Sequence, residues 1–260
     1  EHLRKKRALV ISRSTYAGHG TNANHWLGDN ESTFRSMFLS ISGILAMNMF
    51  GIQLVGADIC GFNGATTEEL CARWIELGSF YPFSRNHNSI NQPSQELYHW
   101  PAVASISIKV LKNRYSLLPF YYTLFYKCHA MGGTVVRPIF FEFPSGHADI
   151  PYLDKQFFVG PSLLISPALE NGQRSVSLFL PASTWYYYWT GDKIESKGEY
   201  HTVSAPLDTI PVHMRAGHII PKYTNPQVTT AGTRKQPLEL LVALDNSGSA
   251  IGDLFIDDGE

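Results

Sequence analysis

The hydrophobic pattern of the chain changes character near Gly132 and Gly133. Before this point, short apolar runs alternate with segments whose apolar residues recur every three or four positions. After it, the helical period disappears and apolar runs lie between Gly, Pro, Asn and Asp residues. The first pattern favours a parallel sheet with crossover helices, and the second favours an antiparallel sandwich. The sequence therefore predicts an α/β unit followed by an all-β unit.

The first unit alternates predicted strands with predicted helices. Apolar runs at residues 8–12 and 52–57 predict strands that are buried on both faces, and a third short element ends around Phe83. Three or four such strand–helix units amount to about half of an eight-stranded barrel. We therefore expect the C-terminal half of a (β/α)8 barrel.

The helices of this unit have clear start and stop signals. An apolar face predicts the first helix, Thr66 or Thr67 can cap the second, and a long stretch at 103–131 predicts a third. Pro119 lies inside that stretch and predicts a kink or a restart. The apolar face of the first helix consists of Phe34, Phe38, Ile41 and Leu45.

Strands fill the second half of the chain. The predicted strands are residues 134–143, 157–169, 175–180, 185–189 and 212–220. A further strand pair at 238–244 and 254–257 follows a polar stretch and predicts the start of a third unit. We thus expect a half barrel at 1–132, a β-sandwich at 133–222 and a truncated second β domain at 223–260.

Both ends of the chain suggest a fragment. Residues 1–7 carry no leader pattern and run straight into an apolar segment, and the chain stops directly after the strand-like residues 254–256. Half a barrel would also leave sheet edges open. We therefore expect this chain to be the C-terminal part of a longer protein.

Composition and motifs exclude several functions. The net charge of −1 argues against a nucleic-acid partner, and polar residues interrupt the most apolar stretch, 43–62, so no membrane contact is predicted. The ten histidines show no metal-ligand spacing, and phosphate-loop and serine-hydrolase motifs are absent. The prediction includes no metal and no cofactor.

Polar side chains follow the predicted strands, where a parallel barrel carries its chemistry. Asp29 follows Trp26 in a Gly-rich segment and is either a catalytic or sugar-binding carboxylate or an Asx turn before the next helix. Asp58 sits in an apolar strand and needs a partner, for which Arg13 is a candidate. His87 lies in a run of four hydrogen-bonding residues typical of polyol recognition.

These segments resemble the α-glucosidase branch of glycoside hydrolase family 31. In the first unit the resemblance covers, in order, residues 11–15 (ISRST), 25–30 (HWLGDN), 55–62 (VGADICGF), 69–71 (ELC), 80–83 (FYPF) and 85–88 (RNHN). It continues in the second unit at 136–138 (VRP), 206–212 (PLDTIPV) and 215–221 (RAGHIIP). Several collinear motifs over almost the whole chain make it specific.

The resemblance implies a role for each matching residue. Asp29 matches the general acid/base of this retaining family, which acts on α-linked glucose in oligosaccharides or glucans. The residues that match those holding the hydroxyls and forming the aromatic walls of the glucose subsite are Arg13, Asp58, His87, Trp26 and Phe62. Residues 21–24 and Phe34 differ from the residues usual in the family, and we expect these differences to affect loop shape and the leaving-group subsites more than the type of reaction.

A retaining glycosidase needs a second carboxylate as nucleophile. In the family it lies in a W-x-D-M-N-E-like motif, which this sequence lacks. We therefore expect the chain to hold the acid/base half of the site only. Two alternatives stay open: a non-catalytic carbohydrate-binding pseudoenzyme, and an α-glucan lyase or transglucosylase that shares the covalent intermediate.

The chain has three cysteines. Cys60 and Cys71 match a pair that is disulfide-bonded in secreted relatives, which suggests the secretory pathway, whereas Cys128 is expected to be a free thiol. The alternative is a pair of reduced core thiols. The sequon that begins at Asn30 adjoins Asp29, and glycosylation there would block the site, so we expect it to be unused.

Overall fold

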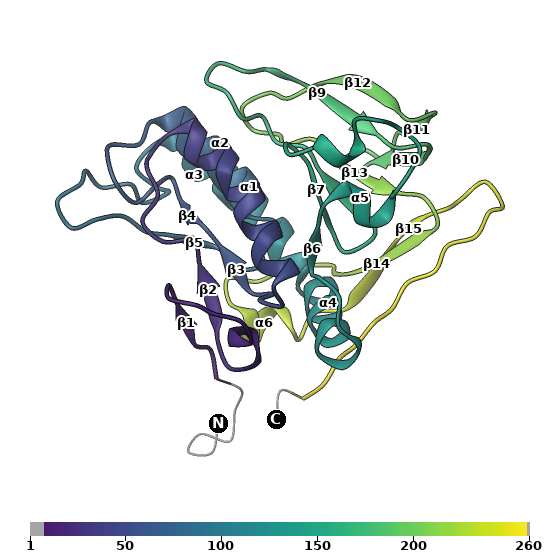
Figure 1. Ribbon diagram of the computed structural model, residues 1–260, viewed down its shortest axis with the longest axis horizontal. Helices are drawn as coiled ribbons and strands as arrows, with labels where there is room; N and C mark the ends of the chain where they lie inside the picture. Colours follow the sequence, from purple (N-terminus) through teal and green to yellow (C-terminus); the bar gives the residue numbers. More distant parts are fainter. Residues whose placement is uncertain (1–7, 259–260) are drawn as a thin grey trace.

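The computed structural model describes residues 8–258, so the N-terminal part of the predicted half barrel, residues 1–7, lies outside the described residues. An α/β half is followed by an all-β half, as predicted. Figure 1 shows the sandwich strands gathered on one side of the molecule and strands β1–β5 on the other. No helix among residues 8–258 is long and apolar enough to cross a membrane.

Two small parallel sheets form the barrel portion. β1 (Ile11–Ser12), β2 (Asn24–Trp26) and β3 (Val55–Gly56) pair in that order, and β4 (Asp58–Ile59) pairs with β5 (Arg85–Asn86). Gly56 lets the chain before β5 come close, because a Cβ there would lie 1.8 Å from the carbonyl oxygen of Phe83. All the strand pairs are parallel, so the strand ends that carry polar residues meet at one edge.

The strand predicted at residues 8–12 is shorter and more exposed than expected. Leu9 and Val10 are 67% and 48% exposed, and only Ile11 and Ser12 are in β1. Within residues 8–258, β1 pairs with β2 alone, so its other edge has no neighbour to bury these side chains. The run predicted at 52–57 also divides, because only Val55 and Gly56 belong to β3.

The helices agree well with their sequence signals. α1 (Phe34–Met49) is capped by Thr33, whose hydroxyl accepts from Ser36 N–H, and α2 (Glu68–Gly78) is capped by Thr67. The long helical stretch divides as Pro119 predicts, into α3 (Pro101–Ser116) and α4 (Leu118–Met131). These helices supply much of the buried apolar core behind the strands.

The β-sandwich has a six-stranded sheet in the order β11-β10-β13-β8-β7-β6, and β12 pairs with β9. The apolar cluster around Phe158, Phe179 and Trp185 fills the space between these strands. The bounds are β6 Val136–Arg137, β7 Phe157–Val159, β8 Leu163–Ile165, β9 Ser175–Leu180, β10 Ser183–Tyr187, β11 Lys193–Ser196, β12 Glu199–Ser204 and β13 Val212–Arg215. Short helical segments are η1 His19–Thr21, α5 Ile139–Glu142, η2 Ile150–Tyr152 and α6 Thr230–Thr233.

Four strand predictions in this half were wrong. The run at 157–169 divides into β7 and β8, which pair antiparallel, and the run at 212–220 divides into β13 and β14 (His218–Tyr223), which lie in different sheets, because a turn interrupts each run. The run at 134–143 ends as a strand at Arg137 and continues as α5, because Pro138 has no N–H to extend the ladder. The run at 254–257 is not a strand, and β15 (Leu238–Ala243) pairs instead with β14.

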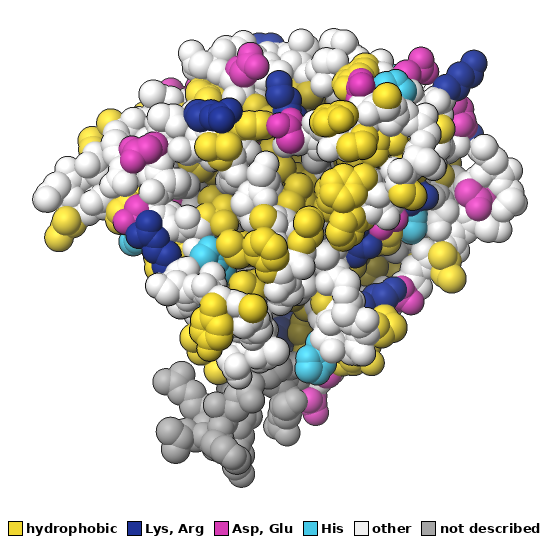
Figure 2. All heavy atoms as spheres, in the orientation of Figure 1, with side chains coloured by type: hydrophobic (Ala, Val, Ile, Leu, Met, Phe, Trp, Pro, Cys, Tyr) yellow, Lys and Arg dark blue, Asp and Glu magenta, His cyan; other side chains and the backbone are white. Residues whose placement is uncertain are grey.

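Figure 2 shows hydrophobic side chains gathered in the middle of the viewed face; exposed ones on α1 and α5 include Leu39, Met49, Phe140 and Phe141.

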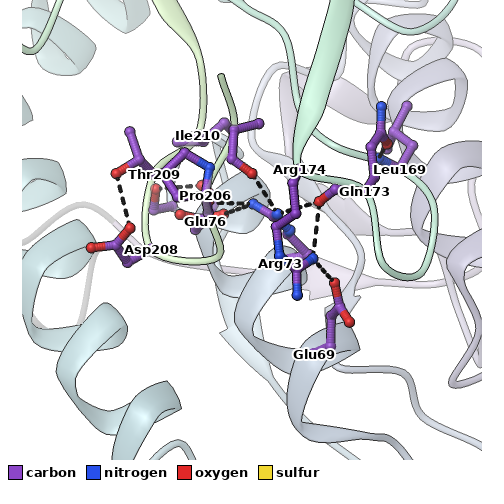
Figure 3. A network of polar contacts seen from close by, with 12 residues as sticks. Glu69, Arg73, Glu76, Leu169, Gln173, Arg174, Pro206, Asp208, Thr209 and Ile210 are labelled. Carbon is purple, nitrogen blue, oxygen red and sulfur yellow. Dashed lines mark hydrogen bonds and ion pairs between the residues drawn. The ribbon is translucent and has the colours of Figure 1, made fainter. Parts of the chain in front are cut away.

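A buried arginine joins the two halves. Arg73 of α2 donates to the carbonyl oxygens of Gln173 (2.7 Å), Ala205 (2.7 Å) and Pro206 (2.8 Å), and its side chain is 1% exposed. Glu76, one turn further along α2, lies 3.4 Å from Arg73 Nη1. Figure 3 shows these contacts running from α2 into two loops of the sandwich. A single side chain therefore holds two sandwich loops against the barrel helix.

Candidate active site

The candidate residues lie at or just beyond the carboxyl ends of neighbouring strands. Arg13 follows β1, Trp26 ends β2, and Asp29 comes three residues later. Asp58 opens β4, and its register partner across the sheet is Arg85 of β5. The parallel pairing thus collects side chains that are up to about seventy residues apart in the sequence.

Asp29 is the accessible carboxylate of this group. Its side chain is 41% exposed, and its Oδ2 lies 3.4 Å from Nη1 of Arg13, which is 58% exposed. Gly28, with φ +83°, lets the arginine lie over the turn, because a Cβ there would come within 2.6 Å of Arg13 Nε. The turn therefore presents Asp29 to solvent beside a cation.

Asp58 is the buried carboxylate, with 1% of its residue surface exposed. Arg85 Nη2 donates to its Oδ1 at 2.6 Å. Burial raises the pKa of Asp58, and the Arg85 hydrogen bond and charge oppose that rise. The second oxygen, Oδ2, has no hydrogen-bond partner within residues 8–258. It is therefore an acceptor that is buried and left without a partner among these residues.

The prediction that Arg13 pairs with Asp58 was wrong. Arg85 takes that position because β4 and β5 are adjacent and their register puts Asp58 opposite Arg85. Arg13 follows β1, which lies in the other sheet beyond β2 and β3, and it reaches Asp29 instead. The strand order, which the sequence does not display, decides the partner.

Aromatic rings lie in the surroundings of Asp58 and Arg85. The Arg85 guanidinium carbon lies 5.4 Å from the centre of the Trp26 ring, so one arginine contacts both Asp58 and an aromatic wall. Phe62 and His87 pack with ring centres 5.1 Å apart. The charge of His87 also acts on Asp58. The structure thus brings Trp26 and His87, and through His87 also Phe62, into the surroundings of Asp58.

Two residues hold this region together in a way that was not predicted from the sequence, where Asn30 was noted only as part of a motif and as the start of a sequon. The Asn30 side chain bonds the loop after β4, and the adjacent Asp29 was the available signal for it. Gln95 is 3% exposed, and its Nε2 donates to the carbonyl oxygens of Gly61 (2.9 Å) and His87 (3.2 Å). No sequence pattern marks Gln95, since its partners are carbonyl groups of distant segments.

A disulfide joins Cys60 to Cys71, and Cys128 is a free thiol. The bond fastens the residue two places after Asp58 to α2, and Cys60 has a positive φ of 74° that only a few non-glycine residues adopt. The segment that carries Asp58 is thus tied covalently to the helix that Arg73 anchors in the sandwich.

The Arg13–Asp29 side of the site is exposed to solvent, whereas Asp58 is buried. A cavity of about 930 Å³ lies elsewhere, near Leu9, Asn24 and Leu54 at the amino ends of β1, β2 and β3. Within residues 8–258 no group of three or more His, Cys, Asp or Glu side chains is arranged to hold a metal ion. The chemistry available here is therefore that of one accessible and one buried carboxylate with cations and aromatic rings.

Comparisons with known proteins match this geometry to one family. Residues 1–124 match the profile described as the glycosyl hydrolases family 31 TIM-barrel domain, and residues 132–220 match the family's C-terminal domain. Lysosomal alpha-glucosidase of Mus musculus is 46% identical over 99% of this chain and 29% of its own length. Human intestinal sucrase-isomaltase is 47% identical over 98% of this chain and 14% of its own length.

A solved structure is also close. The Tris-bound glucosidase II alpha subunit has a TM-score of 0.94 and 36% identity, over 98% of this chain and 28% of that chain. The present chain thus spans less than a third of the length of these relatives.

Proposed function

Because the chain belongs to glycoside hydrolase family 31, we propose that it is part of a retaining α-glucosidase. The complete protein releases glucose from the non-reducing ends of α-linked oligosaccharides or glucans. The observation that carries this proposal is the exposed Asp29 carboxyl, presented at the carboxyl edge of the parallel strands that also carry the buried Asp58–Arg85 pair.

In the proposed reaction Asp29 first acts as an acid. A carboxylate nucleophile attacks the anomeric carbon, the glycosidic bond breaks, and Asp29 gives its proton to the departing oxygen. Asp29, now ionised, then takes a proton from water, whose oxygen attacks the anomeric carbon and releases the nucleophile. The anomeric configuration is inverted twice and so retained. The nucleophile belongs to a part of the protein outside these 260 residues.

The other candidate residues hold the glucose ring. Asp58 offers its free Oδ2 to a sugar hydroxyl, and Arg13 and His87 supply donors around it. Trp26 and Phe62 provide apolar faces for the ring. The charged form of Asp58 is the useful one, because a carboxylate accepts stronger hydrogen bonds than a neutral acid.

The proposal extends to the organisation of the chain and its location. Residues 1–132 are the C-terminal half of the catalytic barrel, 133–222 a β-sandwich and 223–260 the start of a second β domain. The Cys60–Cys71 disulfide supports passage through the secretory pathway, since such bonds persist in oxidising compartments.

The test is Asp29→Asn in the full-length enzyme. Asparagine keeps the size of the side chain but cannot transfer the proton, so we expect most turnover to be lost while binding of a glucose-like inhibitor persists. Asp149→Asn, an exposed aspartate of the sandwich half, is the control and should leave kcat unchanged. Full turnover by Asp29→Asn would refute the proposal.

A further inference from the structure

The loop that carries Asp29 is fastened to the loop that follows Asp58 by one side chain, Asn30. Its Nδ2 donates to the carbonyl oxygen of Asp58 at 3.0 Å, and its Oδ1 accepts from the N–H of Phe62 at 2.8 Å. The backbone carbonyl of Asn30 accepts from Phe62 N–H (3.1 Å) and Asn63 N–H (2.9 Å). The segment next to Asp29 is therefore bonded to both ends of the Asp58–Phe62 segment.

The carboxamide is matched to these two partners. A donor faces a carbonyl oxygen and an acceptor faces an N–H, so the amide satisfies both groups in one orientation only. Neither aspartate, with two acceptors, nor an apolar residue can make both bonds. Both polar atoms of the side chain make hydrogen bonds to the protein backbone.

Asn30 contacts groups whose positions relative to one another must stay fixed in the proposed reaction. Asp29 precedes it directly, Asp58 supplies the carbonyl that it bonds, and Phe62 packs on His87. Proton transfer to a departing oxygen requires the acid at hydrogen-bond distance from that oxygen while the ring is held by its hydroxyls. A shift of Asp29 relative to Asp58 would therefore impair protonation more than it impairs sugar binding.

We infer that Asn30 is a positioning residue, which sets the place of the Asp29 carboxyl relative to the Asp58 side of the glucose subsite. The inference rests on the proposed function, because it assumes that Asp29 is the acid. It also gives a second reason to expect no glycosylation at the sequon that begins at Asn30, because the amide nitrogen that would carry the glycan is hydrogen-bonded to Asp58.

The experiment compares two substrates in the full-length enzyme. A disaccharide has a poor leaving group that needs protonation, whereas a nitrophenyl α-glucoside has a good one that needs little. Displacement of an acid by about 1 Å costs roughly a hundredfold in rate. We therefore expect Asn30→Ala to lower kcat/KM about a hundredfold on the disaccharide and only severalfold on the nitrophenyl glucoside.

The ratio of the two kcat/KM values does not depend on how much enzyme is folded, so a general loss of structure would leave it unchanged. Asn30→Asp is the second variant: it keeps the acceptor for Phe62 but turns an oxygen towards the Asp58 carbonyl, and the same change in ratio is expected. Asn63→Ala is the matched control, because the Asn63 amide bonds the exposed Glu31 side chain at 3.4 Å, and its ratio should equal that of the wild type.

Asp29→Ala is measured in parallel. If Asp29→Ala changes the ratio and neither Asn30 variant does, the inference on Asn30 is overturned and the proposed function stands. If Asp29→Ala leaves the ratio at the wild-type value, the proposed function itself fails, and the inference fails with it.

Discussion

The carboxylate of Asp58 lies 2.6 Å from the guanidinium of Arg85, directly across the parallel pair of β4 and β5. This ion pair favours the charged form of a buried carboxylate, because burial raises the pKa of Asp58 and Arg85 opposes that rise. The accessible pair of Arg13 and Asp29 has a longer distance, 3.4 Å, and larger exposure. The two pairs should therefore respond differently to mutation.

Arg85→Met should weaken both folding and sugar binding. It leaves Asp58 buried without its cation, which raises the Asp58 pKa further and removes a charged hydrogen bond worth about 2 kcal/mol. Arg13→Met breaks an exposed pair, so its stability should change by less than about 1 kcal/mol while KM rises. Thermal unfolding and KM of the full-length variants test this. Equal destabilisation by the two substitutions would contradict it.

Arg73→Lys should destabilise the junction between the barrel helix and the sandwich. A lysine ammonium cannot reach the three carbonyls that the planar Arg73 guanidinium bonds, so a loss of about 3 kcal/mol is expected. Arg174→Lys is the matched control, because Arg174 pairs with Glu69 at the surface. Its effect should stay below about 1 kcal/mol. The two unfolding temperatures, measured on the full-length enzyme, should therefore differ clearly; similar temperatures would argue against a special role for Arg73.

The buried His213 should make the sandwich less stable in acid. Its ring is fully buried, neither ring nitrogen has a partner within residues 8–258, and burial lowers its pKa to about 4. An unfolded histidine has a pKa near 6.5 and so binds a proton that the folded one rejects as the pH falls from about 6.5 to 4. Stability attributable to this residue should fall by up to roughly 3 kcal/mol across that window.

The measurement is urea unfolding of the full-length enzyme and of His213→Leu at pH 7 and at pH 4.5. The variant should gain on the wild type as the pH falls, whereas His129→Leu, on an exposed histidine, should not. A difference between His213→Leu and wild type that is the same at both pH values would show that His213 does not titrate with folding.

Local signals predicted the helices but not every strand partner. Thr67 and Pro119 act within one turn of the chain, so the start of α2 and the division of the long helical stretch were visible in the sequence. β2 was missed because Asn24 and His25 are polar and its pairing with β1 and β3 is not local. The role of Arg85 likewise depends on strand order, although its segment was recognised as polar.

Three carboxylates have separate roles in the proposed reaction: Asp29 is the acid, Asp58 holds the sugar, and the nucleophile lies outside these residues. The most direct test is to trap the glycosyl-enzyme of the full-length protein with a fluorinated α-glucosyl fluoride, digest it and locate the sugar by mass spectrometry. The account predicts that the labelled carboxylate is in a peptide that does not belong to residues 1–260. A label on Asp29 or Asp58 would contradict it.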